Sequence, residues 1–202
     1  MARLPKAIGM TRKADVLRAA TGLFAQRGFH GTSMSAVAEE AGLQKASLYH
    51  WVTSKEDLLF QVLSGALDHL ITETSTVAND ETLDFEAKLR RLVSIHSNFA
   101  VTNDDVMQVF RSEAKWLTGQ PAREMRGVRR RYLEVYEDLF ITAAAKGGLV
   151  VPAAEIPVYV NLIFTMTSYL PQWYRRDGAY SLNEVADLIS GLVLAKVLPR
   201  RD

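Results

Sequence analysis

The chain has 202 residues, of which 48% are hydrophobic and none is cysteine, so it can bury its own core but cannot form disulfides, thiolate zinc sites or thiol nucleophiles. The lack of cysteine suits a reducing cytoplasm, and no apolar run follows the basic first residues, so we expect no secretory signal. The net charge of +1 identifies no partner by itself, and the longest apolar stretch, interrupted at Pro157 and Asn161, is shorter than the ~20 residues of a membrane-spanning helix.

Helical periodicity begins near the N-terminus, and no stretch shows the sustained two-residue alternation of a strand. Gly28 and Gly42 supply the backbone freedom to end two of the helices, and the Ser54 hydroxyl is placed to cap another. The expected helices in this part span residues 11–27, 34–41 and 45–52, and a fourth follows Ser54.

Five further helices are expected in the rest of the chain, which makes an all-α protein of about nine helices. Ser181 and Glu184 have the spacing of a capping box, in which the serine and glutamate side chains satisfy each other's backbone N–H groups at the start of the last helix. The expected spans are 83–100, 102–118, 121–146, 157–175 and 182–199.

Two short helices joined by a three-residue turn, around Gly42, form the sequence pattern of a helix-turn-helix, whose second helix enters the major groove of DNA. Val37, Ala38 and Leu48 are spaced to form its small core. The side chains left to point outward are Gln44, Lys45, Ser47, Tyr49 and His50. Lysine neutralises phosphate, hydroxyl groups donate to phosphate oxygens, and glutamine or lysine reaches base edges. A merely solvated helix face is the alternative interpretation.

The distribution of charge favours DNA over the solvated face. Residues 1–55 carry eight Lys and Arg against three Asp and Glu, a net charge of +5, which leaves −4 for the remainder. A basic end joined to an acidic body is the asymmetry expected when one end meets a polyanion. The sequence therefore predicts that double-stranded DNA binds at the N-terminal quarter.

The segment FHGTSMSAVAEEAGLQKASLYHWVTSKEDLL resembles the DNA-binding signature of the TetR family of bacterial regulators, in its Gly-x-Thr-Ser start, Ala-Gly-Leu turn, Ser-Leu-Tyr core and Ser-Lys-Glu-x-Leu exit. The resemblance covers residues 11–60 and implies roles for single side chains. The implied phosphate ligands are Thr32, Ser33, Tyr49 and Lys55, and Lys45 and Ser47 are implied to reach bases or phosphate.

Two residues depart from the family pattern just after this core. Trp51 stands at a position where the family has an aromatic residue or histidine, and Val52 stands where it has phenylalanine. An indole donates a hydrogen bond but accepts none. Trp51 is therefore either a backbone contact to DNA or a local core residue, and the sequence leaves both open.

The rest of the chain resembles the family's effector-binding and dimerisation domain, so the expected domains are residues 1–54 and 55–202. A two-fold homodimer would read the two halves of an inverted repeat, ~34–36 Å apart. The last helix is apolar on nearly all sides and the eighth behaves alike, which indicates that a second copy covers them. The expected dimer interface comprises Leu162, Val185, Ile189, Leu192 and Val193.

A small-molecule effector site is expected in the body. Neutral polar groups on one stripe of the apolar eighth helix would orient a ligand, although the same stripe would also serve hydrogen bonds across the dimer seam. In the sixth helix, Arg111 would receive an anionic head group unless it pairs with a nearby acid. The expected effector-binding residues are Phe110, Arg111, Trp116, Asn161, Thr165 and Ser168. Together with PQWYRRDGAYSLNEVADLI, they resemble family members that sense fatty or steroid acyl-CoA thioesters.

We therefore expect a cytoplasmic, ligand-responsive regulator, a repressor by the family's usual mode, that binds a palindromic operator as a dimer and is released by a mostly apolar effector. The alternative is a dimeric DNA-binding accessory or architectural protein without an effector. The four histidines, at positions 30, 50, 69 and 96, lie on separate segments and do not have the spacing of metal ligands. The sequence also shows no pair of carboxylates at a catalytic spacing, so we expect no enzyme, metal site or cofactor. His96 is expected to be a hydrogen-bonded structural group.

Overall fold

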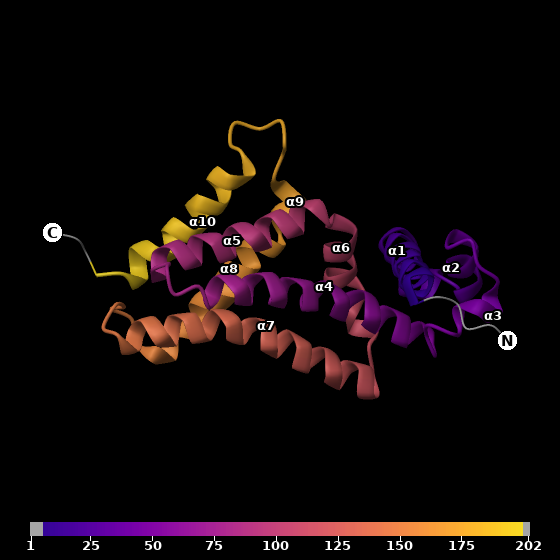
Figure 1. Cartoon of the computed structure of the whole chain (residues 1–202). Coiled ribbons are helices and arrows are strands. Elements are labelled where there is room, and N and C mark those ends of the chain that lie inside the picture. Colours follow the sequence, from indigo (N-terminus) through magenta and orange to yellow (C-terminus); the bar gives the residue numbers. More distant parts are fainter. Residues whose placement is uncertain (1–5, 200–202) are drawn as a thin grey trace. The chain divides into compact units, whose positions relative to one another are not determined.

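The computed structural model of the protein describes residues 6–199, and every regular element in that range is a helix (Figure 1). The predicted all-α class is confirmed. The α-helices are α1 (Lys6–Gly31), α2 (Met34–Glu40), α3 (Lys45–Leu48), α4 (Lys55–Ala78), α5 (Phe85–Thr102), α6 (Asp104–Ser112), α7 (Gly119–Ala145), α8 (Ile156–Ser168), α9 (Leu170–Trp173) and α10 (Leu182–Val197). Two 3₁₀ turns are η1 (Ala114–Trp116) and η2 (Ala153–Glu155).

Several helices are shorter than expected because local geometry interrupts them. The expected eighth helix is two elements, α8 and α9, since Pro171 has no N–H and its ring clashes with the carbonyl four residues earlier. The expected third helix keeps its α-helical form only to Leu48, after which Trp51 N–H bonds to the Leu48 carbonyl three residues back. The expected sixth helix ends at Ser112 and continues as η1.

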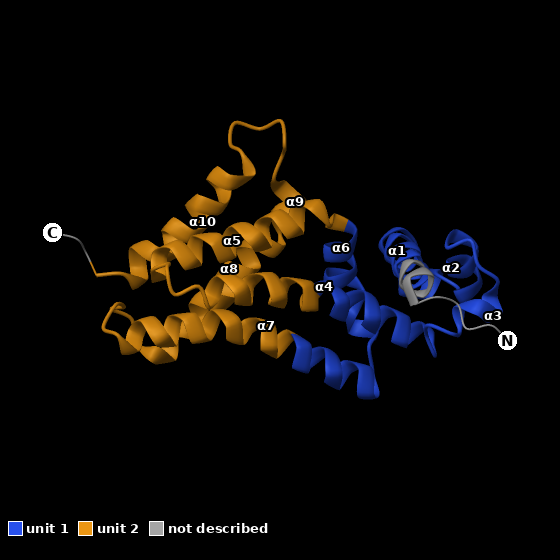
Figure 2. Ribbon diagram, in the orientation of Figure 1, with its two compact units in different colours: residues 1–66, 105–128 blue, residues 67–104, 129–202 orange. Residues whose placement is uncertain are grey.

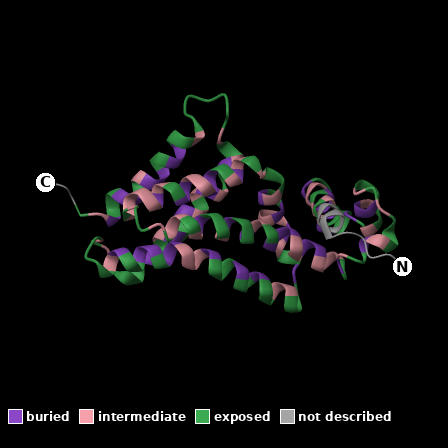
Figure 3. Ribbon diagram, viewed as in Figure 1, coloured by how far each residue is buried: buried purple, intermediate pink, exposed green. Residues whose placement is uncertain are grey.

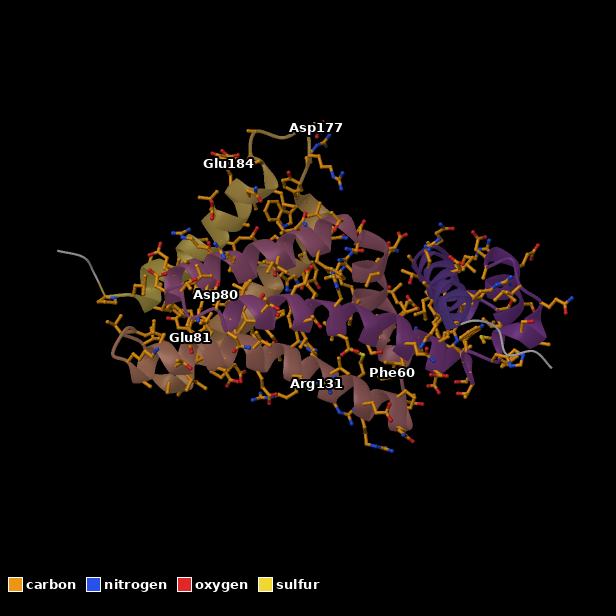
Figure 4. The ribbon with its side chains drawn as sticks, viewed as in Figure 1. Phe60, Asp80, Glu81, Arg131, Asp177 and Glu184 are labelled. Carbon is orange, nitrogen blue, oxygen red and sulfur yellow. The ribbon has the colours of Figure 1, made fainter. Side chains whose placement is uncertain are left out.

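The starts of α4 and α10 agree with the predicted caps, whereas α1 begins at Lys6, before the expected residue 11. The Ser54 hydroxyl accepts the Asp57 N–H at 3.0 Å, and the full capping box of Ser181 and Glu184 opens α10 (Figure 4). These side chains satisfy backbone N–H groups that have no partner inside the helix. The predicted capping box is therefore confirmed.

The described chain divides into two compact units (Figure 2). Within the described residues, the first comprises residues 6–66 and 105–128, and the second comprises residues 67–104 and 129–199. The first unit thus takes in α6 and the start of α7, which the expected division after residue 54 left with the body. The units are defined by packing and not by function, so the functional boundary between residues 54 and 55 stays a prediction.

Each unit has its own core (Figure 3). In the first, α1 packs on α2 and α2 on α3, with Phe24 and Leu48 fully buried. In the second, α10 packs along α5 and α8 packs against both, and the Tyr136 and Phe140 side chains of α7 are fully buried. Burial of one such side chain contributes about 1.5–3 kcal/mol. The first core therefore fixes α2 and α3, the two helices of the predicted DNA-binding motif.

Within residues 6–199, no helix combines the length and the apolar character needed to cross a membrane.

Candidate nucleic-acid interface

The turn between α2 and α3 is closed by backbone geometry that requires glycine. Gly42 has a φ of 65°, in the left-handed region. The Gly42 N–H bonds to the Glu39 carbonyl at 3.0 Å, and the Leu43 N–H bonds to the Ala38 carbonyl at 2.8 Å. This pair of bonds is a Schellman motif, which satisfies the last carbonyls of α2 and turns the chain sharply. The two helices therefore have the connection of a helix-turn-helix.

The predicted reading face is exposed along α3 and the turn after it. The side chains of Gln44, Lys45 and His50 are exposed, and Tyr49 retains 47% of its accessible surface. Ser47 is half-buried. On the opposite side, Leu48 and Val52 are buried, which fixes the short helix on the core. The structure thus presents the predicted side chains on the surface, and their individual roles on DNA stay predictions.

Ser33 lies exposed at the start of α2, and Thr32 does not. The Ser33 hydroxyl caps α2 by accepting the Ala36 N–H at 3.1 Å, and a hydroxyl that accepts a hydrogen bond can still donate one to phosphate. The Thr32 side chain is only 1% exposed and donates to the carbonyls of Leu23 and Gly28. Both partners of the hydroxyl lie inside the first unit, so the predicted phosphate contact of the Thr32 side chain is wrong.

Lys55 also has partners inside the protein. Its ammonium donates to the carbonyls of Phe29 at 2.7 Å and Thr32 at 3.0 Å, and lies 4.4 Å from the centre of the Phe29 ring. The half-buried side chain therefore ties the end of α1 to the start of α4. An ammonium has three donors, so one remains for phosphate. The family resemblance pointed to Lys55, but its spacing from Phe29 gave no signal of the internal role.

The end of the reading segment is held by a polar network. Asp57 accepts hydrogen bonds from the Thr53 N–H at 2.7 Å and from the Gln61 amide at 2.9 Å, and the same Gln61 amide donates to the Trp51 carbonyl at 3.2 Å. Partial burial pushes the pKa of Asp57 up, but the hydrogen bonds from Gln61 and Thr53 outweigh it and hold the pKa below its usual value. Asp57 lies three residues after the predicted cap Ser54, whereas no sequence pattern marks Gln61. Trp51 is half-buried, so both interpretations of its side chain stay open.

The predicted effector-binding residues of the sixth helix lie in the first unit. Phe110 and Arg111 are half-buried, and Trp116 is exposed. The Trp116 ring meets the edge of His30, with ring centres 4.2 Å apart. Trp116 therefore packs against the end of α1, and its place in an effector wall stays a prediction.

The predicted polar stripe of α8 is divided between outside and inside. Asn161 and Thr165 are exposed and line a shallow open groove of about 290 Å³ with Pro157, Val158 and Leu162. Only the end of the stripe turns inward, where the Ser168 hydroxyl lies 3.2 Å from His96 Nε2. The exposed part favours the alternative of a dimer seam over that of a ligand wall.

The predicted dimer residues also separate into two faces. Val185, Ile189 and Val193 are 4–7% exposed and belong to the core of their own protomer, where α10 packs on α5. Leu162 and Leu192 remain 48% and 66% exposed. The prediction that Val185, Ile189 and Val193 lie in the dimer interface is therefore wrong, because they are core residues of their own protomer. The number of apolar residues on a helix does not show which of its faces packs against the same protomer. The large apolar side chains that are exposed on these two helices are Val158, Leu162, Leu188 and Leu192.

His96 is hydrogen-bonded, as predicted, and the structure shows that it is also buried. Its two ring nitrogens lie 3.0 Å from the Tyr132 hydroxyl and 3.2 Å from the Ser168 hydroxyl, and its ring meets the edge of Phe164. Burial lowers the pKa of His96 to about 4, so the ring is neutral at neutral pH. Among the residues that the structure describes, no group of three or more histidine, aspartate or glutamate side chains is placed to hold a metal ion.

Both halves of the sequence match known families. Residues 16–62 match the family described as bacterial regulatory proteins, tetR family, and residues 82–197 match that described as tetracyclin repressor-like, C-terminal domain. The chain is 27% identical over 191 residues to the HTH-type transcriptional repressor KstR2 of Rhodococcus jostii, covering 91% of this chain and 89% of that protein.

Solved structures share the fold over nearly the whole chain. The structure of AibR in complex with isovaleryl coenzyme A and operator DNA has a TM-score of 0.76 at 24% identity, and covers 94% of this chain and 100% of that chain. The structure of FadR from Bacillus subtilis in complex with stearoyl-CoA also has a TM-score of 0.76, at 17% identity, and covers 90% of this chain and 97% of that chain.

Proposed function

The chain belongs to the tetR family of bacterial regulatory proteins, and we propose that it is a repressor that binds an inverted-repeat operator as a homodimer and is released by a small, mostly apolar molecule. The observation that carries the proposal is the α2–turn–α3 motif, closed at Gly42, with Lys45 and Tyr49 on its exposed face. A positively charged, hydroxyl-bearing face on a helix that follows a tight turn suits the major groove and its flanking phosphates.

A homodimer is proposed from the exposed apolar side chains of α8 and α10. Val158 and Leu162 on α8 and Leu188 and Leu192 on α10 are each about half or more exposed, although these helices pack against each other in one core. A second copy related by two-fold symmetry would cover both helices with the same surface. Leu192→Glu is expected to yield folded monomers, because the residue touches little of its own core, whereas Ile189→Glu would disrupt the protomer. Sedimentation distinguishes these results, and a fully dimeric Leu192→Glu protein would contradict this interface.

The effector is proposed to be an acyl-CoA thioester or another lipid-like acid. Two proteins of similar fold bind such ligands in their solved structures: AibR is in complex with isovaleryl coenzyme A and FadR with stearoyl-CoA. A ligand that prefers one of two conformations shifts the protein toward it, and DNA is released when the preferred state holds the two reading heads at the wrong spacing.

The test begins with a duplex that the protein itself selects from a random-sequence pool. Release of this duplex is then measured by fluorescence anisotropy against acyl-CoAs of several chain lengths, free fatty acids and hydrophobic cations. We expect acyl-CoAs to release the duplex from the wild-type protein. At the same concentrations, they should leave the salt dependence of the residual binding of a Lys45→Ala protein unchanged. Release by the cations alone would reject this effector class. A protein that no compound releases would favour the accessory or architectural alternative.

A further inference from the structure

Helix α1 is broken at one residue inside the first unit. Gly28 has φ 70° and ψ 168°, outside the helical region and in a region that only glycine enters readily. An intact helix would join the Phe29 N–H to the Ala25 carbonyl, four residues earlier. A non-helical Gly28 lies between these two groups and opens that ring, so each of them needs another partner.

Side chains from the α6 segment supply both partners. The Gln108 amide donates to the Ala25 carbonyl at 2.8 Å, and the Glu113 carboxylate accepts the Phe29 N–H at 2.7 Å. Glu113 is only 9% exposed, and Ala25 and Phe29 are also buried. The two side chains thus replace, one at each end, the single helical hydrogen bond that the break at Gly28 removes.

We propose that Gln108 and Glu113 form a latch that holds α1 in its kinked form and thereby positions α2 and α3 on DNA. Buried N–H and C=O groups without partners are costly, so the Ala25 carbonyl and the Phe29 N–H have two satisfactory arrangements: bonded to the latch, or bonded to each other in a continuous helix. The residues after Gly28 lead directly into α2, so the change from one arrangement to the other re-aims the reading helices.

The latch sits where a signal from the second unit would arrive. Helix α6 follows α5 after the single residue Asn103, and α5 belongs to the second unit. A displacement of α5 is therefore passed along the chain to Gln108 and Glu113. This inference rests on the proposed function, since DNA binding is its readout. The element that couples the second unit to DNA is the end of α1, which has two discrete states, kinked and continuous.

Three substitutions test the latch with the duplex that the wild-type protein selects. Gln108→Ala removes the donor, Glu113→Ala removes the acceptor, and Gly28→Ala disfavours the kink. An added Cβ at Gly28 would lie 3.6–3.9 Å from the Glu113 carboxyl group, which is ordinary contact, so the effect comes from the backbone angle. Each variant is expected to bind the selected duplex at least tenfold more weakly and a random duplex within about twofold of wild type.

Controls separate the latch from a general loss of stability. Gln120 and Glu124 form an exposed pair of the same residue types on α7, at 2.6 Å, and Gln120→Ala and Glu124→Ala are expected to bind both duplexes as the wild type does. Glu113→Gln keeps an oxygen acceptor and should restore most of the affinity. Because both substitutions act on one element, adding Glu113→Ala to Gly28→Ala should weaken binding no further. The Phe29 amide resonance should shift in Glu113→Ala and stay in place in Glu124→Ala.

Two results would overturn the latch: wild-type affinity for the selected duplex in Gln108→Ala and Glu113→Ala, or additive losses in the double variant. If Glu113→Ala does not fold, Gln108→Ala decides alone, because its side chain is exposed. A wild-type protein that selects no duplex at all would instead reject the proposed function.

Discussion

The two compact units hold their helices in place by different means. In the first, the side chains of Lys55, Thr32 and Glu113 form hydrogen bonds with backbone groups of α1. These bonds fix the direction in which the chain leaves the end of α1. In the second, the helices meet mainly through buried aliphatic and aromatic surface, and the directional bonds there are fewer, such as the one from the Tyr136 hydroxyl to the Leu92 carbonyl at 3.1 Å. A hydrogen bond depends on distance and angle, whereas the hydrophobic effect has no direction. The direction of α1 therefore depends on a few named bonds, whereas the second unit depends mostly on the area that its helices bury.

The largest expected effect is the loss of an aromatic side chain from the second core. Phe140 is fully buried, and its ring meets the edge of Phe85 with centres 5.1 Å apart. Phe140→Ala should lower the free energy of unfolding by about 3–5 kcal/mol, as measured by urea denaturation. The neighbouring Ile141 is 52% exposed, so Ile141→Ala should cost less than about 0.5 kcal/mol. Equal losses in both variants would contradict the view that this core stabilises by burial.

The next effect is the pH dependence of the free energy of unfolding that the buried His96 of the second unit causes. The pKa of His96 is about 4 in the folded protein, against 6.5 ordinarily, so the unfolded chain binds more protons between these values. The free energy of unfolding should therefore fall as the pH is lowered from 6.5 to 4, by about 3 kcal/mol in total. Above pH 6.5 the ring is neutral in both states and contributes no pH dependence.

Two variants test whether the His96 ring causes this pH dependence. His96→Gln should remove this part of the pH dependence of unfolding, measured by denaturation at several pH values. His69 is exposed on α4, and His69→Gln should leave the dependence in place. A slope that persists in His96→Gln would show that other groups cause it.

How much the sequence predicts differs between the two units for a physical reason. The turn at Gly42, the cap at Ser54 and the exposed Lys45 follow from short-range rules, because each signal involves residues only a few positions apart. The latch joins residues 84 positions apart, from Phe29 to Glu113, and left no pattern to detect. The helix spans of the second unit were largely predictable, but their inner and outer apolar faces were not. Ile189 and Leu192 are both aliphatic, and only packing shows that one is buried and the other exposed.

A smaller effect concerns the choice of DNA sequence. Lys45 is exposed at the start of α3 and is expected to contact bases or their flanking phosphates. Lys45→Ala should lower the discrimination between the selected duplex and single-base variants by about 1–3 kcal/mol, because a base contact favours one sequence. Lys146 is exposed near the end of α7, and Lys146→Ala should leave the ranking of duplexes unchanged. An unchanged ranking in Lys45→Ala would limit Lys45 to nonspecific attraction.

The smallest effect compares equivalent helix caps in the two units. Ser33 caps α2 and Ser181 caps α10, each by accepting a backbone N–H with its hydroxyl. Replacing either with alanine should lower the free energy of unfolding by about 1 kcal/mol. Only Ser33→Ala should also weaken operator binding, because α2 carries the reading helix and Ser33 itself is proposed to donate to phosphate. Ser33→Thr keeps the hydroxyl and should restore both properties. Equal loss of operator affinity in Ser181→Ala would show that general destabilisation, and not the position of α2, sets the affinity for DNA.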